Sequence, residues 1–320
     1  MQNFGTADKQ VQELANELWG NINATTVKVN HYGKGMVIDG MNLQEALDML
    51  KIIPDFKAAP GDSILFIHRL LKKEGSVYFI SNQKNSPVEM VTEFRVTGKI
   101  PELWDAVTGT KRDLLYYSQT PETTTVTVEL AALESAFIVF RKDGVAINSN
   151  TKSNYPTISK TVIISTPWSV NFDYKMRGPA KPFIFNALTN WAQNANDSMK
   201  YYSGTAYYHT TFNSTTIKKG EVVMLDLGTV NVIAKVRVNG IIVGGAWIAP
   251  YKVDITKALK PGQNKLEIKV VNTWVNRLIG DSKLPVGERK TWSFINPYNP
   301  QSVLLPSGLL GPVKLEVMKF

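Results

Sequence analysis

The most regular alternation of hydrophobic and polar residues lies in the last third of the chain. Apolar and polar side chains alternate over 234–239 and again over 265–270, a period of two that predicts strands with one buried and one exposed face. Asn239-Gly240 supplies the two residues that a type I′ hairpin turn needs at positive φ, and Pro-Gly-Gln-Asn at 261–264 supplies a second turn. This stretch therefore predicts part of an antiparallel β-sandwich.

Residues 57–142 show a similar pattern in shorter strands. Glycine, asparagine and proline punctuate this stretch at the spacing typical of a sandwich. The expected strands lie at 63–69, 77–81, 88–96, 126–130 and 136–140. Residues with reactive or binding side chains are few here: Trp104 and Asp105 are adjacent, and His68 lies within a strand, where a structural role is favoured. We predict a small β-sandwich.

The first 56 residues have a mixed pattern. Apolar residues recur at helical spacing over 11–19 and predict an amphipathic helix that Gly20 ends. Asn42 and Glu45 have the spacing of a capping box and open a second helix that stops before Pro54, with a hairpin or strand pair expected between the two helices. Two helices and a short sheet bury too little surface to fold alone. We therefore predict a truncated α/β segment, the end of a larger domain.

The domain organisation follows from these patterns. Residues 143–160 are polar and poor in large hydrophobic side chains, which predicts a linker. From residue 161 to residue 320 the alternation predicts about eight to ten antiparallel strands in a jelly roll. The expected chain is mainly β and consists of a truncated α/β segment (1–56), a small β-sandwich (57–142), a linker (143–160) and a jelly-roll domain (161–320).

Composition narrows the class of function without defining one. The 320 residues carry a formal net charge of +9, but the lysines are scattered singly and no basic helix or zinc-ligand spacing accompanies them, so a solvated surface is favoured over a nucleic-acid site. No apolar run reaches about 18 residues, so no membrane-spanning segment is expected. The absence of cysteine excludes disulfides and thiolate metal sites, and the first residues lack the apolar core of a secretory signal.

The sequence has no catalytic motif. The strand–helix alternation of an α/β barrel is absent. The three histidines lie away from any Gly-x-Ser-x-Gly elbow, and the glycine turn at 33–35 lacks the spacing of a phosphate loop. No loop of alternating aspartates predicts a calcium site, although Asp173, Asp197 and Glu316 are candidate ligands; no other cofactor is expected.

Two motifs near the end of the chain carry a family resemblance. They are NTWVNRLIGD at 272–281 and SGLLGPVKL at 307–315. Together they resemble the C-terminal part of bacterial α-L-rhamnosidases of glycoside hydrolase family 106, and the preceding VRVNGIIVGGAW is similar to the galactose-binding-like jelly roll of family 2 enzymes. The resemblance continues upstream: 57–142 resembles the small sandwich in the middle of rhamnosidase-like chains, and 1–56 resembles the end of an amidotransferase-like domain.

The resemblance implies sugar chemistry. In the resembled enzymes the catalytic carboxyl groups belong to an N-terminal α/β barrel, so this chain is expected to be inactive alone, to support that barrel and to contribute carbohydrate-binding loops. The implied ligand is a plant or microbial glycan, with rhamnose among the candidate sugars, and the implied parent enzyme is periplasmic or secreted. Two alternatives stay open: a free-standing carbohydrate-binding protein, and a purely structural module without a ligand.

The candidate sugar-binding residues lie at loop positions of the predicted jelly roll. An aromatic ring packs on the apolar face of a sugar, while amide, guanidinium and carboxylate groups bind its hydroxyls. By these criteria the candidates are Trp247, Trp274, Asn276, Arg277, Asp281 and Trp292. We expect the loop after residue 272 to present Trp274, Arg277 and Asp281 to solvent in one concave patch. In the alternative, Trp274 plugs the sandwich, and Arg277 and Asp281 form a structural ion pair that pins the loop.

Overall fold

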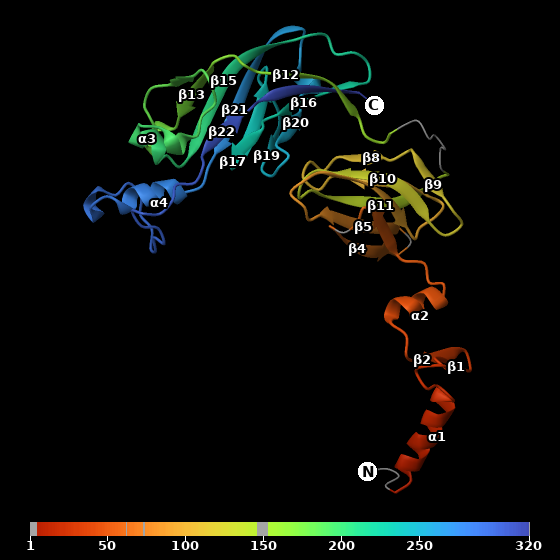
Figure 1. Cartoon of the computed structure of the whole chain (residues 1–320). Helices are drawn as coiled ribbons and strands as arrows, with labels where there is room; N and C mark the ends of the chain where they lie inside the picture. The colour runs from red at the N-terminus through yellow and green to blue at the C-terminus, as the bar shows by residue number, and fades with distance from the viewer. Residues whose placement is uncertain (1–4, 62, 73, 146–152, 320) are drawn as a thin grey trace. The chain divides into compact units, whose positions relative to one another are not determined.

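The computed structural model describes residues 5–61, 63–72, 74–145 and 153–319, and the chain divides into two compact units, Met1–Lys57 and Ala58–Phe320. Antiparallel sheets make up most of the second unit, and its helices are few and short (Figure 1). The mainly-β class predicted from the sequence is confirmed. Among the described residues, no helix is both long enough and apolar enough to cross a membrane.

The first unit is a small α/β segment. Its elements are α1 (Ala7–Trp19), β1 (Val29–Tyr32), β2 (Gly35–Ile38) and α2 (Leu43–Met49), with β1 and β2 paired as a hairpin. The predicted capping box opens α2: Asn42 Oδ1 accepts from the Glu45 amide at 2.9 Å, and Glu45 Oε2 accepts from the Asn42 amide at 3.1 Å. Within these two helices no residue is buried, and Val11 and Leu14 of α1 are 65% and 57% exposed. Local hydrogen bonds, more than packing, hold this unit.

A small sandwich of two antiparallel sheets follows. One sheet has the strand order β3-β6-β10-β9 and the other has the order β4-β5-β11-β7-β8. The strands are β3 (Phe56–Ala59), β4 (Ile64–Leu71), β5 (Gly75–Asn82), β6 (Val88–Phe94), β7 (Lys99–Trp104), β8 (Lys111–Asp113), β9 (Tyr117–Gln119), β10 (Thr124–Leu130) and β11 (Ser135–Asp143). Tyr78, Phe94 and Phe140 fill its core. The sequence pattern did not predict β7, because Pro101 removes a backbone donor and argues against a central strand.

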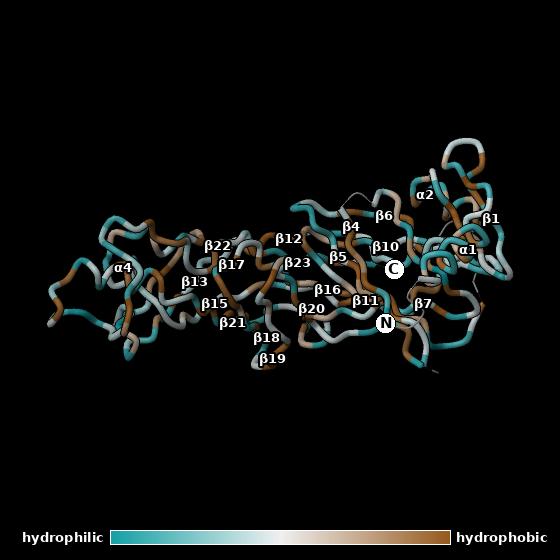
Figure 2. The backbone as a smooth tube through the Cα atoms, turned by 90° about the horizontal axis from the view of Figure 1, so that it is seen from below, coloured by the Kyte–Doolittle hydropathy of each residue, from teal (hydrophilic) through white to brown (hydrophobic). Residues whose placement is uncertain are grey.

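Strand β4 lies at one edge of its sheet and is apolar and exposed. Leu65, Ile67 and Leu70 are 62%, 60% and 76% exposed, and the hydropathy colouring of Figure 2 marks the strand as largely hydrophobic. Soluble proteins usually cover such an edge or place charges on it, because its free backbone groups and apolar side chains promote association. Strand β4 therefore presents a surface that fits an apolar partner.

The last domain is a jelly roll of two main sheets. Their strand orders are β12-β23-β16-β20 and β14-β13-β15-β21-β18-β19, and β17 pairs with β22 beside them. The strands are β12 (Thr157–Ile163), β13 (Trp168–Phe172), β14 (Phe183–Phe185), β15 (Thr205–Ser214), β16 (Glu221–Asp226), β17 (Thr229–Asn231), β18 (Ile233–Val238), β19 (Ile241–Ala246), β20 (Lys252–Asp254), β21 (Gly262–Val271), β22 (Gly308–Gly311) and β23 (Lys314–Lys319). Two short α-helices, α3 (Asp197–Lys200) and α4 (Val275–Ser282), lie at one end of this domain (Figure 1).

Part of the stretch predicted as a linker, 143–160, belongs to strands of the two neighbouring domains. Strand β11 extends to Asp143 and β12 starts at Thr157, so both ends of the 143–160 stretch belong to strands. Asn154 is buried and bonds the amide and the carbonyl of Tyr116 at 2.9 and 2.7 Å. Residues 146–152 of that stretch lie outside the described residues. All residues of β12 are exposed, and its first four residues, 157–160, are mostly polar, which is why the sequence pattern placed them in the linker.

The core of the jelly roll matches the predicted alternation. Leu266, Ile268 and Val270 of β21 are buried, and the predicted turn places Asn239 and Gly240 at φ of 52° and 84°. Aromatic side chains fill the space between the sheets, and they are joined by a buried hydrogen bond. Trp191 Nε1 donates to the Tyr208 hydroxyl at 2.7 Å, and the Leu309 amide donates to the same oxygen at 3.1 Å. These bonds fix the core beside the segment that carries α3.

Candidate functional site

The residues expected as a loop after β21 form helix α4. The helix starts directly after Trp274, whose side chain makes no capping bond. Its buried face includes the polar residues Asn276, Arg277 and Asp281, so the usual signal of an apolar stripe facing the core is missing. Because polar residues occupy the buried face of α4, the sequence suggested a loop here and not a helix.

Helix α4 packs against the segment that follows α3. The Arg277 amide donates to Ser203 Oγ at 3.2 Å. A Cβ added at Gly280 would lie 2.7 Å from Cγ and 2.8 Å from Cβ of Tyr201, closer than real contacts allow, so glycine at this position permits the approach. The side chains of α4 are thereby held against residues about 80 positions earlier in the chain.

Arg277 and Asp281 are buried, so the expectation that both face solvent is wrong. They are 8% and 2% exposed, one helical turn apart on the same face of α4. Asp281 Oδ2 accepts from the amide and the hydroxyl of Thr291 at 2.7 and 2.5 Å. The other carboxylate oxygen, Oδ1, and Nη2 of Arg277 are buried without a hydrogen-bond partner. The structure thus shows neither the solvent-facing pair nor a fully satisfied structural ion pair.

Asn276 has a structural role. Its Nδ2 donates to the Leu305 carbonyl at 2.7 Å and to Ser307 Oγ at 3.0 Å, and its Oδ1 accepts from the Leu305 amide at 2.8 Å. The residue is 1% exposed. Because these bonds use both ends of the amide, Asn276 holds the 305–307 segment and is removed from the sugar-binding candidates.

A cavity of about 330 Å³ lies beside α4 and is lined by Arg277 and Asp281. Its lining residues come from three separate stretches of the chain. Four of them are cationic and two are acidic: Arg177, Arg277, Lys283 and Lys290 against Asp197 and Asp281. Tyr201 forms part of the wall and accepts a hydrogen bond from Lys283 Nζ at 2.9 Å. The cavity is therefore small and has twice as many cationic as acidic residues in its lining.

The electrostatics of the cavity act on Arg277 in opposing directions. Burial lowers the pKa of Arg277, the charge of Asp281 raises it, and the nearby charge of Arg177 lowers it, leaving a net lowering. Arginine stays protonated at physiological pH despite such a shift. The guanidinium is thus a buried cation with one carboxylate and one like charge close by.

The three candidate tryptophans are all exposed. Trp274, Trp247 and Trp292 are 53%, 58% and 86% exposed, so Trp274 does not plug the sandwich as the structural alternative proposed. Trp292 follows Thr291, the residue that binds Asp281, which places its backbone next to the cavity. None of the three lines the cavity. Phe294, which is 88% exposed, lies in the same segment, for which the sequence analysis predicted no strand or helix.

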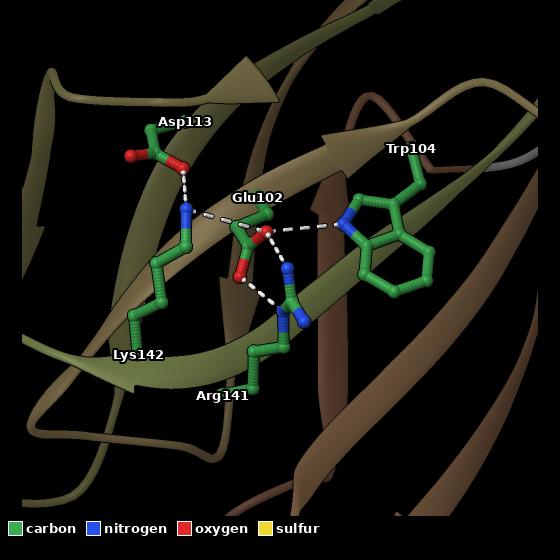
Figure 3. A network of polar contacts seen from close by, with 5 residues as sticks. All are labelled: Glu102, Trp104, Asp113, Arg141 and Lys142. Carbon is green, nitrogen blue, oxygen red and sulfur yellow. Dashed lines mark hydrogen bonds and ion pairs between the residues drawn. The ribbon is translucent and has the colours of Figure 1, made fainter. Parts of the chain in front are cut away.

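A second polar cluster lies in the small sandwich around Glu102 (Figure 3). Glu102 is 1% exposed; Arg141 donates to it at 2.9 and 3.2 Å, and Trp104 Nε1 donates at 3.2 Å. Lys142 Nζ lies 3.5 Å from Glu102 and 2.6 Å from Asp113. Burial acts to raise the pKa of Glu102, but the bonds and charges of Arg141, Trp104 and Lys142 leave that pKa below its usual value. The cluster is a saturated structural network with Glu102 ionised.

A cavity of about 600 Å³ in the small sandwich is lined by Glu129, Glu134 and Tyr155. Burial raises the pKa of Glu134, and burial together with the charge of Glu89 raises the pKa of Glu129. Burial also raises the pKa of Tyr155 to about 12. The sequence did not indicate this cavity, because Glu129 looks like an ordinary solvent-facing strand position and Glu134 and Tyr155 lie in connecting segments.

The remaining reactive residues have structural contacts. His68 stacks on Tyr78 with ring centroids 4.0 Å apart, in the structural role expected for it. Of the candidate calcium ligands, Asp173 accepts from the Lys175 amide, and Glu316 pairs with Lys252 at 2.6 Å. Within the described part of the chain, no three histidine or acidic side chains come together as metal ligands.

Comparison with known proteins gives two family matches. Residues 2–118 match the family model described as alpha-L-rhamnosidase, and residues 189–297 match the model described as glycosyl hydrolase 2 galactose-binding domain-like. A solved structure of a rhamnosidase from Novosphingobium sp. PP1Y matches 98% of this chain with a TM-score of 0.86 and 35% identity. A protein of Formosa agariphila named "Putative beta-glucuronidase" is 37% identical over 187 residues, which is 51% of this chain.

The matched regions are small parts of those relatives. This chain spans 29% of the Novosphingobium rhamnosidase and 16% of the Formosa protein. The resemblance to α-L-rhamnosidases and to a galactose-binding-like domain predicted from the sequence is confirmed.

Proposed function

We propose that this chain is a non-catalytic part of an α-L-rhamnosidase-like glycoside hydrolase, which supports the catalytic domain and adds a carbohydrate-binding surface. The observation that carries the proposal is the structural match of 98% of the chain to 29% of a rhamnosidase, because that enzyme has most of its length outside the matched part. The catalytic carboxyl groups of the proposed whole enzyme belong to its other part.

The exposed apolar surface of β4 supports a docking role. Leu65 and Ile67 expose two large side chains on one face of an edge strand, and Leu70 exposes a third on the other face. A tightly packed neighbour gains stability by covering them. The partner that we assign to this surface is the catalytic domain of the same enzyme. In the first unit, the exposed apolar residues of α1 also fit a docking role.

The jelly roll supports a carbohydrate-binding role. Trp274 directly precedes α4 and Trp292 follows it in the chain, and both offer exposed aromatic rings of the kind that pack on a sugar. The ligand is a plant or microbial glycan, and rhamnose is the first sugar to test.

A replacement experiment tests the docking role. The chain is fused to the catalytic part of the Novosphingobium rhamnosidase, in place of the matching 29% of that enzyme. We expect the fusion to hydrolyse an aryl α-L-rhamnoside and to have a higher Tm than the catalytic part alone. Leu65→Lys with Ile67→Lys is expected to reduce that gain, whereas Val91→Lys, at an exposed apolar residue of the other sheet, is the matched control. A fusion no more stable than the catalytic part alone would contradict the proposal.

A further inference from the structure

We infer that the cavity beside α4 binds a saccharide that carries an oxyanion, either a carboxylate or a sulfate ester, through Arg277 and Asp281. The inference rests on the proposed function for the ligand being a sugar. We expect the sugar to carry an oxyanion because of the charges that line the cavity and the unpartnered atoms of Arg277 and Asp281.

The unpartnered atoms indicate an absent ligand. Almost all buried polar atoms in folded proteins have a hydrogen-bond partner, and an orphaned one in a charged group is costly. Here a buried donor, Arg277 Nη2, and a buried acceptor, Asp281 Oδ1, both lack one in residues that line the same cavity. Neither atom is open to solvent in this structure, so the proposal includes a rotation of each side chain toward the cavity; an acidic sugar then supplies both complements, since its oxyanion accepts from the guanidinium and a neighbouring hydroxyl donates to the carboxylate.

The charge balance favours an anion over water or a neutral sugar. Arg177 lies close enough to Arg277 for their like charges to disfavour the protonated guanidinium, and Lys290 adds a further positive charge to the lining. A water molecule satisfies hydrogen bonds but leaves this repulsion in place, whereas a bound oxyanion relieves it. Asp197 and Asp281 offset only half of the four cationic groups.

The backbone holds the second arginine in place for this purpose. Arg177 has φ of 63° and ψ of 26°, the left-handed conformation that residues other than glycine adopt infrequently. Such conformations persist where the surrounding structure holds them, and they are enriched at ligand sites. Arg177 follows a short 3₁₀ turn of Tyr174–Met176, about 100 positions before Arg277, so two distant segments converge on one cavity.

The size of the cavity limits the ligand to about one sugar unit. Small-molecule sites have volumes of about 300 Å³ upward, and this cavity of about 330 Å³ is at the low end. Tyr201 closes one wall and is held by Lys283, so the cavity has a fixed shape on that side. Further units of a glycan would extend from it toward the exposed segment that carries Trp292.

The test is a titration of the whole chain followed by amide NMR, with the Gly280 amide as the reporter because Gly280 lines the cavity. The ligands are sodium D-glucuronate, D-galactose 6-sulfate, D-glucose, L-rhamnose and inorganic sulfate. The proteins are wild type, Arg277→Gln, Arg177→Gln and the control Arg237→Gln, an arginine of the same domain that pairs with Glu267 at 3.3 Å. Arg177 is exposed, so its variant provides a folded protein even if Arg277→Gln does not fold.

We expect saturable shifts with glucuronate or the sugar sulfate, about tenfold or more weaker binding in Arg277→Gln and weaker binding in Arg177→Gln, and no change in Arg237→Gln. D-Glucose is expected to leave Gly280 unshifted. The carboxylate and sulfate ligands compared with each other identify the oxyanion, and tighter binding of the sugar sulfate than of inorganic sulfate shows that the sugar ring itself contributes to binding.

Two results would overturn the inference: no shift of Gly280 with either anionic sugar, or equal affinity in wild type, Arg277→Gln and Arg177→Gln. Binding of L-rhamnose that is insensitive to both arginine variants, with no anion binding, would preserve the proposed carbohydrate-binding role and reject the oxyanion site. Absence of binding by any sugar would reject both.

Discussion

Gly280→Ala tests whether α4 is packed as the site requires. The added Cβ would lie 2.7 Å from Cγ, 2.8 Å from Cβ and 3.0 Å from Cδ1 of Tyr201. Two of these atoms are next to the Tyr201 backbone, so a simple rotation of the ring cannot remove the contact. Overpacking of this kind costs about 1–3 kcal/mol, while replacing a helical glycine by alanine gains up to about 1 kcal/mol. We expect a net loss of about 0.5–2 kcal/mol in the free energy of unfolding.

The matched control is Gly287→Ala. An added Cβ at Gly287 meets no atom within 4 Å, and this glycine lies in a short 3₁₀ turn at 286–288, close to the same cavity in sequence. Its substitution is expected to be neutral or slightly stabilising. Urea unfolding followed by tryptophan fluorescence measures both variants. A Gly280→Ala protein as stable as wild type, or more stable, would show that α4 does not pack on Tyr201.

Three further predictions follow from other parts of the chain. Tyr208→Phe removes the acceptor of two buried donors, Trp191 Nε1 and the Leu309 amide. It is expected to lower the free energy of unfolding by about 2–4 kcal/mol, measured by urea unfolding. The control Tyr207→Phe, on the opposite face of β15, is expected to change it by less than about 0.5 kcal/mol. Glu102→Gln is expected to cost about 1–2 kcal/mol at pH 7, discounted because Arg141 and Lys142 are partly exposed. Because the pKa of Glu102 is lowered on folding, this difference is present above its unfolded pKa and disappears as the pH falls below about 4.5, and a constant difference from pH 7 to 3 would contradict it. In hydrogen exchange, the amides of α1 and α2 are expected to exchange faster than those of β21, since within these helices no residue is buried; equal protection would mean that the first unit is a complete domain.

The strands of this protein were predictable because their side chains follow the simplest rule. Along β21 and β18, alternate residues are buried, and that alternation is visible in the sequence. The turn at Asn239-Gly240 was predictable for a separate reason, since few residue pairs adopt two positive φ angles in succession. Local chemistry and packing agree at these positions, so the sequence alone was sufficient.

The site was only partly predictable. Arg277 and Asp281 were identified as candidates by their residue types, but their burial depends on Tyr201 and Ser203, about 75 to 80 positions earlier, and on Thr291. No local pattern reports such contacts. The charge balance of the cavity depends in the same way on Arg177, which was not a candidate at all. Strand β7 was missed for the opposite reason, because tertiary pairing overrides the local preference of Pro101.

The measurement that tests the central claim most directly is the hydrolysis of an aryl α-L-rhamnoside by the purified chain. The non-catalytic role predicts no turnover above that of buffer, from wild type and from Glu129→Gln/Glu134→Gln alike. Of the residues in this chain, those two are the best candidates for a catalytic pair. They are carboxyl groups that line one cavity, and their pKa values are raised, as the pKa of a general acid must be. Turnover by the wild-type chain that is lost in the double variant would show that the chain carries a catalytic site of its own, and the account would be wrong.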